Sequence, residues 1–267
     1  MLVMNRFCIL SFYCIALNFM GIYAQAQTQR GPQQLFTLLE SSQTGIHFNN
    51  RLDENTERNI LLYDNFYGGA GVGIGDFNQD GLEDIYFAGN LVDGKLYLNT
   101  GNLVFEDVSA SSGLVNDGGW TTGVTVADVN NDGWPDIYLS RELYDEKPDL
   151  RRNLLYINNG DATFTESAEQ YGVADQQRTR HASFFDYNKD GFLDLILLTQ
   201  PPNPGSYSKY AGANLLRPEY HIKLYKNRGG NSFVEVSSLA GVARSGYPNA
   251  VSTSDFNNDG WTDFYIA

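Results

Sequence analysis

Residues 76–84 read DFNQDGLED, and the same nine-residue pattern returns three more times along the chain. The other copies are DVNNDGWPD at 128–136, DYNKDGFLD at 186–194 and DFNNDGWTD at 255–263. All four fit D-[FVY]-N-x-D-G-x-x-D. Regular self-similarity is the sequence signature of a repeat architecture, so this nonapeptide sets the frame in which the rest of the chain is interpreted.

Each nonapeptide lies between two stretches that are typical of β-strands. Small and β-branched residues precede it, as in TGVTVA at 122–127, and an apolar run follows it, as in LILL at 195–198. Such residues favour pleated strands, and a turn-forming loop between two of them indicates a hairpin. We therefore expect a strand, a loop and a second strand in every repeat.

A second shared phrase, L-Y-x-N, follows the first three nonapeptides and leads through a glycine-containing turn to a phenylalanine. Its copies are LYLN at 96–99, LYIN at 155–158 and LYKN at 224–227, with Phe105, Phe164 and Phe233. This pattern indicates a third strand, a hairpin turn and a fourth strand. One repeat is thus a four-stranded antiparallel unit, and the predicted fold class is all-β.

The nonapeptides begin at 76, 128, 186 and 255, so successive starts are 52, 58 and 69 residues apart. Propeller repeats are typically ~40–50 residues long, and two insertions, 141–152 and 200–220, account for the excess. We predict a β-propeller of four-stranded blades. Because propeller loops present partner surfaces, the insertions are candidate contacts for a glycan or a protein; inert surface loops are the alternative. Their candidate contact residues are Tyr144, Tyr207, Tyr210, Tyr220, Arg151, Arg152 and Arg217.

The two ends of the repeat region leave the closure of the ring open. Residues 35–46 (LFTLLESSQTGI) resemble the closing half of a unit, so we interpret 27–66 as a segment with a ring-closing outer strand. A short helix packed on one end is the alternative. The fourth copy stops after its second strand, which would expose a sheet edge. We therefore expect a fragment of a larger ring, with a closed four-blade ring as the alternative.

The spacing within each nonapeptide predicts a calcium site. Ca²⁺ takes about six to eight oxygen ligands. Side chains at positions 1, 3 and 5 of a tight loop converge, Gly at 6 permits the turn, position 7 offers its carbonyl and the last Asp reaches back. Asx turns without metal are the alternative. The expected ligands, for up to four structural Ca²⁺, are Asp76, Asn78, Asp80, Leu82 (carbonyl) and Asp84; Asp128, Asn130, Asp132, Trp134 (carbonyl) and Asp136; Asp186, Asn188, Asp190, Phe192 (carbonyl) and Asp194; Asp255, Asn257, Asp259, Trp261 (carbonyl) and Asp263.

The amino end has the features of a secretory signal peptide. Arg6 precedes an apolar run, and small residues at Ala24 and Ala26 suit cleavage, so residues 1–26 are expected to be removed. We predict export to the periplasm, the cell surface or the medium, with no membrane span in the mature chain. A membrane anchor is the alternative, because the apolar run approaches the ~20 residues of a span.

The composition of the chain argues against nucleic acid as a partner and against zinc as a metal. The chain of 267 residues has 32 acidic and 18 basic residues and a formal charge of −14, which argues against a nucleic-acid partner. Both cysteines, Cys8 and Cys14, lie in the signal segment, so the mature chain offers no thiolate and few histidines for zinc.

The repeats over 67–267 closely resemble the FG-GAP/VCBS family, the repeat of integrin α-subunit propellers and of exported bacterial proteins related to the CRTAC/ASPIC-UnbV group. The nonapeptide, the strands around it, the L-Y-x-N phrase and the later Phe carry the resemblance. It implies a β-propeller, usually seven-bladed, with one Ca²⁺ in the loop between the first two strands of a blade. Some Ca²⁺-dependent polysaccharide lyases use related propellers.

The sequence favours binding over catalysis. It contains neither G-x-S-x-G nor H-E-x-x-H. We therefore expect a module that binds a protein or a polysaccharide, and a Ca²⁺-dependent polysaccharide lyase is the alternative. Such chemistry needs an acid–base pair in one groove. His181, five residues before the third nonapeptide, is a candidate for contact with a ligand in the central channel.

Overall fold

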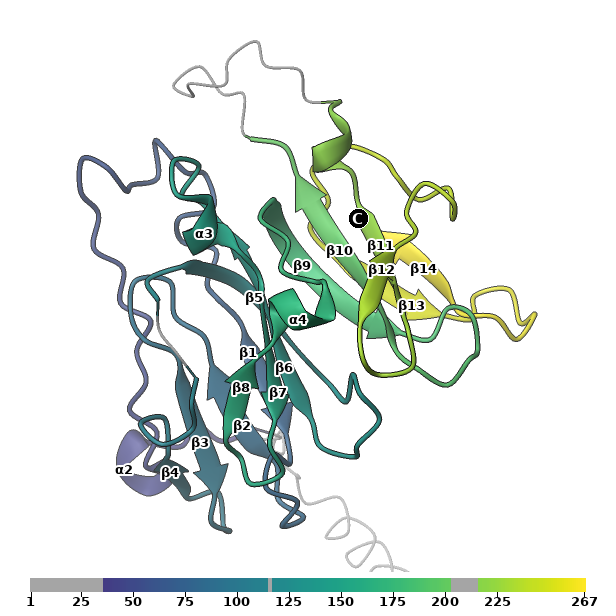
Figure 1. Cartoon of the computed structure of the whole chain (residues 1–267). Coiled ribbons are helices and arrows are strands. Elements are labelled where there is room, and N and C mark those ends of the chain that lie inside the picture. Colours follow the sequence, from purple (N-terminus) through teal and green to yellow (C-terminus); the bar gives the residue numbers. More distant parts are fainter. Residues whose placement is uncertain (1–35, 115–116, 203–215) are drawn as a thin grey trace, which may run out of the picture. The chain divides into compact units, whose positions relative to one another are not determined.

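The structure, a computed structural model of the chain, describes residues 36–114, 117–202 and 216–267 (Figure 1). The chain divides into two compact units, Met1–Leu39 and Glu40–Ala267. The predicted signal peptide at 1–26 lies outside the described residues, as do residues 203–215 of the longer insertion, including Tyr207 and Tyr210. All the strands assigned in the described ranges belong to the second unit.

The strands form three four-stranded antiparallel sheets and one two-stranded sheet, each with its strands in chain order (Figure 1). This meander is the predicted repeat unit, and the expectation of an all-β chain built of propeller blades is confirmed.

The first blade contains β1 (Val72–Gly75), β2 (Asp84–Phe87), β3 (Lys95–Asn99) and β4 (Phe105–Asp107). The second contains β5 (Trp120–Ala127), β6 (Asp136–Glu142), β7 (Leu154–Asn158) and β8 (Phe164–Glu166). The third contains β9 (Arg178–Phe185), β10 (Asp194–Gln200), β11 (Lys223–Asn227) and β12 (Phe233–Glu235), and the pair is β13 (Val251–Ser254) and β14 (Asp263–Ile266).

The repeated motifs mark the strand boundaries. The last Asp of every nonapeptide is the first residue of the second strand of its blade, as Asp84 is in β2. It pairs with the last residue of the innermost strand, as Gly75 does with Asp84. The Asn of L-Y-x-N ends the third strand, and the Phe that follows begins the fourth. The nonapeptide is therefore the connection between the two inner strands of each blade.

Neighbouring blades pack face to face and share their cores. Phe77 and Leu96 of the first blade pack in one cluster with Ile137 and Phe164 of the second. A second cluster joins the second and third blades, and a third joins the third blade to β13 and β14. Every residue of β6 and β10 is buried, because a blade covers each face of these strands. A strand covered on both faces has a continuous apolar run rather than alternation.

Glycine is required where the innermost strands meet. A Cβ on Gly73 of β1 would lie 2.8 Å from methyl groups of both Val124 and Val126 in β5. Real Cβ contacts are not that short, so glycine lets the two innermost strands approach closely. Packing against β5 thus explains the glycines at 71, 73 and 75 of the glycine-rich run.

The amino-terminal segment differs from the expected ring-closing outer strand. Residues 36–46 contain no strand, and α2 (Ser41–Thr44) stands where the end of the closing segment was expected. The helix ends at Gly45, whose φ of 77° is left-handed, and a Cβ there would lie 2.5 Å from the carbonyl oxygen of Phe105. Gly113 meets Phe164 in the same way. Residues 41–46 thus contact the next blade as the tail of a repeat does. An outer strand needs the edge of a third strand to pair with, and no such pairing occurs for the described residues 36–40.

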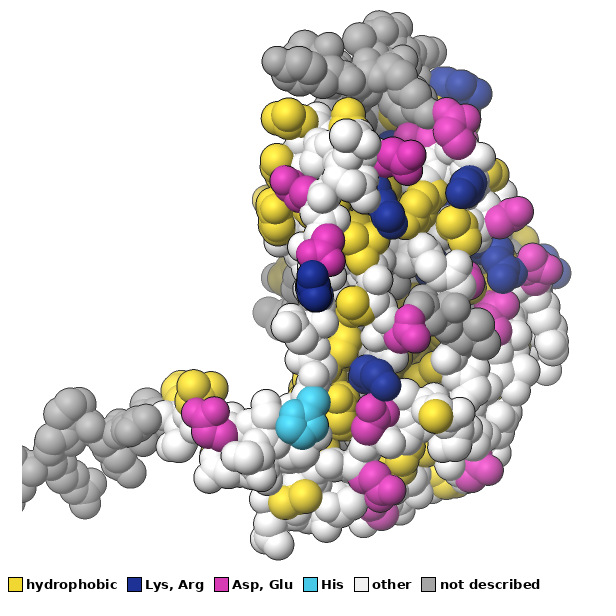
Figure 2. Space-filling view, turned by 90° about the vertical axis from the view of Figure 1, so that its left-hand side faces the viewer, with side chains coloured by type: hydrophobic (Ala, Val, Ile, Leu, Met, Phe, Trp, Pro, Cys, Tyr) yellow, Lys and Arg dark blue, Asp and Glu magenta, His cyan; other side chains and the backbone are white. Residues whose placement is uncertain are grey.

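The other short helices lie in connections. Helix α3 (Pro148–Arg151) belongs to the insertion 141–152, whose first two residues still form part of β6; α4 (Ala168–Tyr171) follows β8, and a 3₁₀ turn (Pro218–Tyr220) precedes β11. No helix in the described ranges is long and apolar enough to cross a bilayer. Acidic, basic and apolar side chains are interspersed over the surface seen in Figure 2.

Candidate functional site

Each nonapeptide folds into a loop that gathers its side-chain oxygens around its own backbone N–H groups. In the first loop the N–H of Asp80 donates to Asp76 Oδ1 at 3.0 Å and to Asn78 Oδ1 at 3.1 Å, so these two oxygens lie around one nitrogen. The N–H of Gly81 donates to Asp76 Oδ2 at 2.9 Å, and the N–H of Leu82 donates to Asp80 Oδ1 at 2.9 Å. The structure therefore places the side chains at positions 1, 3 and 5 against the backbone N–H groups of their own loop, and their role as metal ligands stays a prediction.

The other three loops repeat this geometry. In each, the position-5 N–H donates to the oxygens at positions 1 and 3, and the N–H groups at 6 and 7 donate to the carboxylates at 1 and 5. The residues placed in this way are Asp128, Asn130, Asp132 and Trp134; Asp186, Asn188, Asp190 and Phe192; Asp255, Asn257, Asp259 and Trp261. Left-handed backbone at position 4, as at Gln79 (φ 55°), and at the glycine, as at Gly81 (φ 86°), makes the turn tight.

The ninth Asp has a role that the sequence did not reveal. Asp84 is fully buried, and its carboxylate accepts the N–H of Phe77 at 2.9 Å and the N–H of Asn99 at 2.8 Å. It therefore fastens the loop to the third strand of the blade. Asp136 and Asp194 make the same pair of bonds, whereas Asp263 accepts one, from Phe256. The N–H group that the ninth Asp accepts from the third strand belongs to the Asn of L-Y-x-N, so the recurrence of this phrase was the feature of the sequence that pointed to the contact.

The same Asn also reaches the preceding blade. Asn158 Nδ2 donates to the carbonyl of Phe77 at 2.9 Å, and Asn227 Nδ2 donates to the carbonyl of Val129 at 2.8 Å. Both carbonyls belong to position 2 of a loop in the neighbouring blade. The first and second acidic loops are consequently held from their own blade and from the next.

Burial and crowding of acids raise the pKa of the ninth Asp in the first three loops, Asp84, Asp136 and Asp194. Desolvation is the main cause, and it raises the pKa of Asp136 to about 7 and that of Asp194 to about 6. For Asp136 the nearby Asp132 and Asp128 add to the rise, while the two backbone N–H bonds oppose it. A carboxylate in such surroundings is stabilised by a nearby cation.

The donor chemistry of the loops fits a hard dication. Every loop offers three carboxylates, one amide oxygen and the backbone carbonyl at position 7, and oxygen is the ligand that Ca²⁺ prefers. Among residues 36–114, 117–202 and 216–267, no three His, Cys, Asp or Glu side chains are already grouped as a metal site. The carboxylates instead bond to the N–H groups of the loop, which leaves each oxygen a further lone pair.

His181 lies apart from the loops. It is on β9, and its Nδ1 would lie 3.4 Å from a Cβ on Gly123 of β5, so it packs against the innermost strand of the second blade. Burial, together with the neighbouring Arg180, lowers its pKa. The structure thus places His181 between the innermost strands of the second and third blades.

Comparison with known proteins shows which proteins have similar repeats. A model of the FG-GAP-like repeat matches residues 46–139 and 147–197. Integrin alpha pat-2 of Caenorhabditis elegans is 30% identical over 167 residues, which cover 54% of this chain and 13% of that protein. Cartilage acidic protein 1 is 33% identical over 100 residues in Homo sapiens (37% of this chain, 14% of that protein) and 27% over 204 residues in Xenopus tropicalis (70% and 29%).

A solved structure of an Agrocybe aegerita lectin, described as recognising non-reducing terminal N-acetylglucosamine, aligns with a TM-score of 0.35 and 18% identity over 73% of this chain and 42% of that one. The matched region spans between 13% and 29% of the length of the curated relatives named above. The repeat model covers more than half of this chain and includes the first two blades nearly whole, the inner strands of the third blade and the first three acidic loops. The chain therefore belongs to the FG-GAP-like repeat family.

Proposed function

We propose that this chain is a calcium-stabilised propeller module of an exported protein and that it acts by binding a protein or a glycan. The observation that carries the metal part is the repeated loop geometry: four times, one N–H group draws together the oxygens at positions 1 and 3, with the carboxylate at position 5 beside them. Chance Asx turns do not require the same three acids at the same offsets.

The residues that would hold the ion are those at positions 1, 3, 5, 7 and 9 of each loop. A bound Ca²⁺ supplies positive charge that offsets the repulsion between the loop carboxylates. The chain itself holds the first loop at two further points. Its ninth Asp, Asp84, bonds to the third strand of the same blade, and Asn158 of the next blade donates to the loop carbonyl of Phe77. Ordering of the loops thereby stabilises the contacts between blades.

Export and binding are supported by separate observations. Residues 1–26 have the pattern of a signal peptide. The relatives are named as an integrin chain and a cartilage protein, and neither name describes an enzyme. Fractionation of the producing cells, with mass analysis of the mature amino end, tests export and cleavage near Ala26.

Thermal unfolding of the purified protein tests the metal role. We expect a chelator to lower the melting temperature, Ca²⁺ to restore it and Mg²⁺ to restore it less, because Mg²⁺ demands a stricter octahedral site. One site at a free Ca²⁺ concentration of ~100 Kd adds about 2.7 kcal/mol. Glu106→Gln, an exposed acid on β4 outside the loops, is the matched control and keeps the full response. A melting curve that is identical with chelator and with Ca²⁺ contradicts the proposal.

A further inference from the structure

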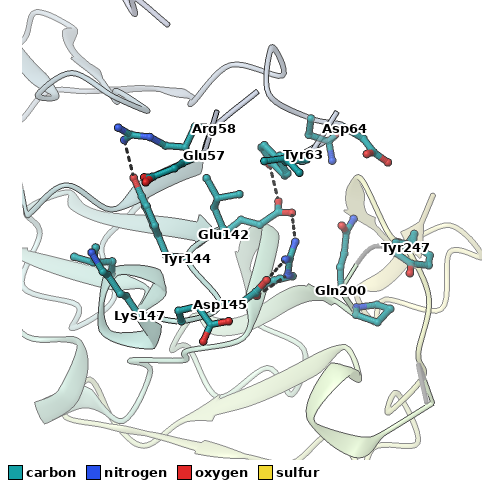
Figure 3. Close-up of a pocket in the computed structure, with 17 residues that line it drawn as sticks. Glu57, Arg58, Tyr63, Asp64, Glu142, Tyr144, Asp145, Lys147, Gln200 and Tyr247 are labelled. Carbon is teal, nitrogen blue, oxygen red and sulfur yellow. Dashed lines mark hydrogen bonds and ion pairs between the residues drawn. The ribbon is translucent and has the colours of Figure 1, made fainter. Parts of the chain in front are cut away.

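Figure 3 shows the lining of a cavity of about 720 Å³. The cavity includes Glu142 and Gln200, which end β6 and β10, so it lies at the ends of these strands opposite to the acidic loops. Its lining residues lie within 57–65, within 142–150 from the last residue of β6 onward, at the start of β9, at the end of β10 and at Tyr247 before β13. Several blades and the amino-terminal segment therefore build it together. Its size lies within the ~300–1,000 Å³ of small-molecule sites.

The deepest charged wall residue is Glu142, the last residue of β6. It is 2% exposed, and its Oε2 accepts the hydroxyl proton of Tyr63 at 3.0 Å. Arg178 Nη1 lies 3.5 Å from Oε1, and Arg180 Nη1 lies 3.9 Å from Oε2. Burial raises the pKa of Glu142, and the two arginines oppose the rise. This carboxylate is thus fixed in place by three partners from other elements.

A second set of pairs fixes the adjoining wall. Arg178 holds both oxygens of Asp145, with Nε to Oδ1 at 3.2 Å and Nη2 to Oδ2 at 2.6 Å. Arg151 Nη1 lies 2.5 Å from the same Oδ1. Bidentate pairs of this kind hold both groups in one orientation. The positive and the negative groups of this wall are therefore paired with each other.

The backbone beside these pairs is strained in a way that the repeat does not explain. Leu143 and Tyr144 have φ values of 67° and 48°, in the left-handed region that side chains other than glycine, asparagine and aspartate rarely adopt. The other non-glycine residues with positive φ in the described ranges lie in the acidic loops or in the outer hairpins, namely Gln79, Asn131, Lys189, Asn258, Asn102, Leu103 and Ala162. Strain of this kind gathers at ligand sites.

The strained pair brings Tyr144 to the cavity. The Tyr144 hydroxyl accepts from Arg58 Nη1 at 3.5 Å, and Figure 3 shows both residues with Glu57 on one side of the cavity. Tyr63 lines the same space, and Tyr247 stands on its far side. The lining thus combines three phenol rings with fixed hydrogen-bonding groups.

We infer that this cavity binds a neutral oligosaccharide. A sugar hydroxyl both donates and accepts, so one ring satisfies fixed carboxylate oxygens and guanidinium N–H groups together, while its C–H faces lie on the tyrosine rings. A charged group in the same place would compete for Arg178 or Glu142 and leave a buried partner unpaired, which is strongly unfavourable. The inference deepens the binding half of the proposed function and does not depend on the acidic loops.

Calorimetric titration in Ca²⁺ against neutral oligosaccharides, uronic-acid oligosaccharides and lysine- or arginine-containing peptides tests the inference. We expect saturable binding of a neutral oligosaccharide without turnover. Tyr144→Asn removes the ring and keeps a residue that tolerates positive φ, and it is expected to weaken this binding about tenfold or more. Tyr247→Ala, on the opposite wall, is a second variant with a similar expected loss.

Tyr265→Ala is the matched control, because this exposed tyrosine lies on β14 and does not line the cavity. It keeps binding within about twofold, and all three variants keep the wild-type melting temperature within a few degrees. Four results overturn the inference: no neutral oligosaccharide binds, only the charged glycans or the peptides bind, binding survives both cavity variants, or unsaturated products appear. If a chelator leaves the melting temperature unchanged while the oligosaccharide still binds, the calcium proposal is contradicted and the inference about the cavity is not.

Discussion

The side-chain amide of Gln79, at position 4 of the first acidic loop, donates to the backbone carbonyl of Gly133, at position 6 of the second, at 2.8 Å. Asn131 makes the same bond to Gly191 one blade further on, also at 2.8 Å. In the next step Lys189 Nζ lies 4.4 Å above the ring of Trp261. The acidic loops are therefore linked in a chain from blade to blade, next to the proposed metal ligands.

Replacement of Gln79 by Gly tests this link. Glycine removes the amide and accepts the left-handed backbone, so the lost bond is the main change. Asn258→Gly is the matched control, because Asn258 has the same backbone in the fourth loop and makes no such bond among the described residues. We expect Gln79→Gly to lower the free energy of unfolding by about 0.5–1.5 kcal/mol more than Asn258→Gly in urea titrations. Equal changes would show that the link adds no stability.

Asp136→Asn tests the fastening role of the ninth Asp. The amide keeps one oxygen but turns its NH₂ group towards a backbone N–H, either that of Val129 or that of Asn158, and a buried donor is then unpaired. We expect a loss of about 1–3 kcal/mol in the free energy of unfolding. Asp263→Asn should cost less, because Asp263 is half-buried and accepts one such bond. Comparable losses at the two positions would contradict the proposed role.

Asp80→Ala is expected to remove one metal site and leave the others. Asp80 is the proposed ligand at position 5 of the first loop, and each of the other three loops has an Asp of its own at this position. Calorimetric Ca²⁺ titration should therefore show the stoichiometry reduced by one, with the affinity of the remaining sites within about threefold of wild type. An unchanged stoichiometry would remove Asp80 from the ligand set.

Gly73→Ala is expected to separate the innermost strands of the first two blades. The new methyl group meets Val124 and Val126 at 2.8 Å, and overpacking of this kind costs about 1–3 kcal/mol. Gly246→Ala is the control, since a Cβ there has no neighbour closer than 4.0 Å. Chemical denaturation should show a clear loss for the first variant and almost none for the second. A neutral Gly73→Ala would mean that the strands separate without cost.

Glu142 gives a prediction of pH dependence. Because burial raises its pKa, the folded chain binds this proton more tightly than the unfolded chain does. The resulting stability is present below the unfolded pKa of about 4.3 and is lost as pH rises through the folded pKa. The stability of the wild type relative to Glu142→Gln should therefore fall as pH rises from about 4. A relative stability that rises instead would show that Arg178 and Arg180 outweigh burial.

Local patterns were sufficient to predict the blade. The nonapeptide, the L-Y-x-N phrase and the following Phe each lie at a strand boundary, as at Asp84, Asn99 and Phe105, because turn formation and strand formation depend on neighbouring residues. The position of the acidic loop between the two inner strands was predictable for the same reason, whereas the convergence of positions 1, 3 and 5 on a metal ion stays a prediction. The expected outer strand before residue 46 was wrong for the described residues, since a strand also needs a partner edge that the motif does not specify.

The sequence by itself determined the repeat unit, the order of its strands and the position of every acidic loop, because these follow from contacts between residues close together in the chain. Only the tertiary structure decided that Asn158 holds the loop carbonyl of Phe77, 81 residues away, and that Tyr63, Glu142 and Arg178 meet in one cavity. These contacts arise from the packing of one blade on another. The facing side chains come from distant segments, so no pattern within a single repeat contains them.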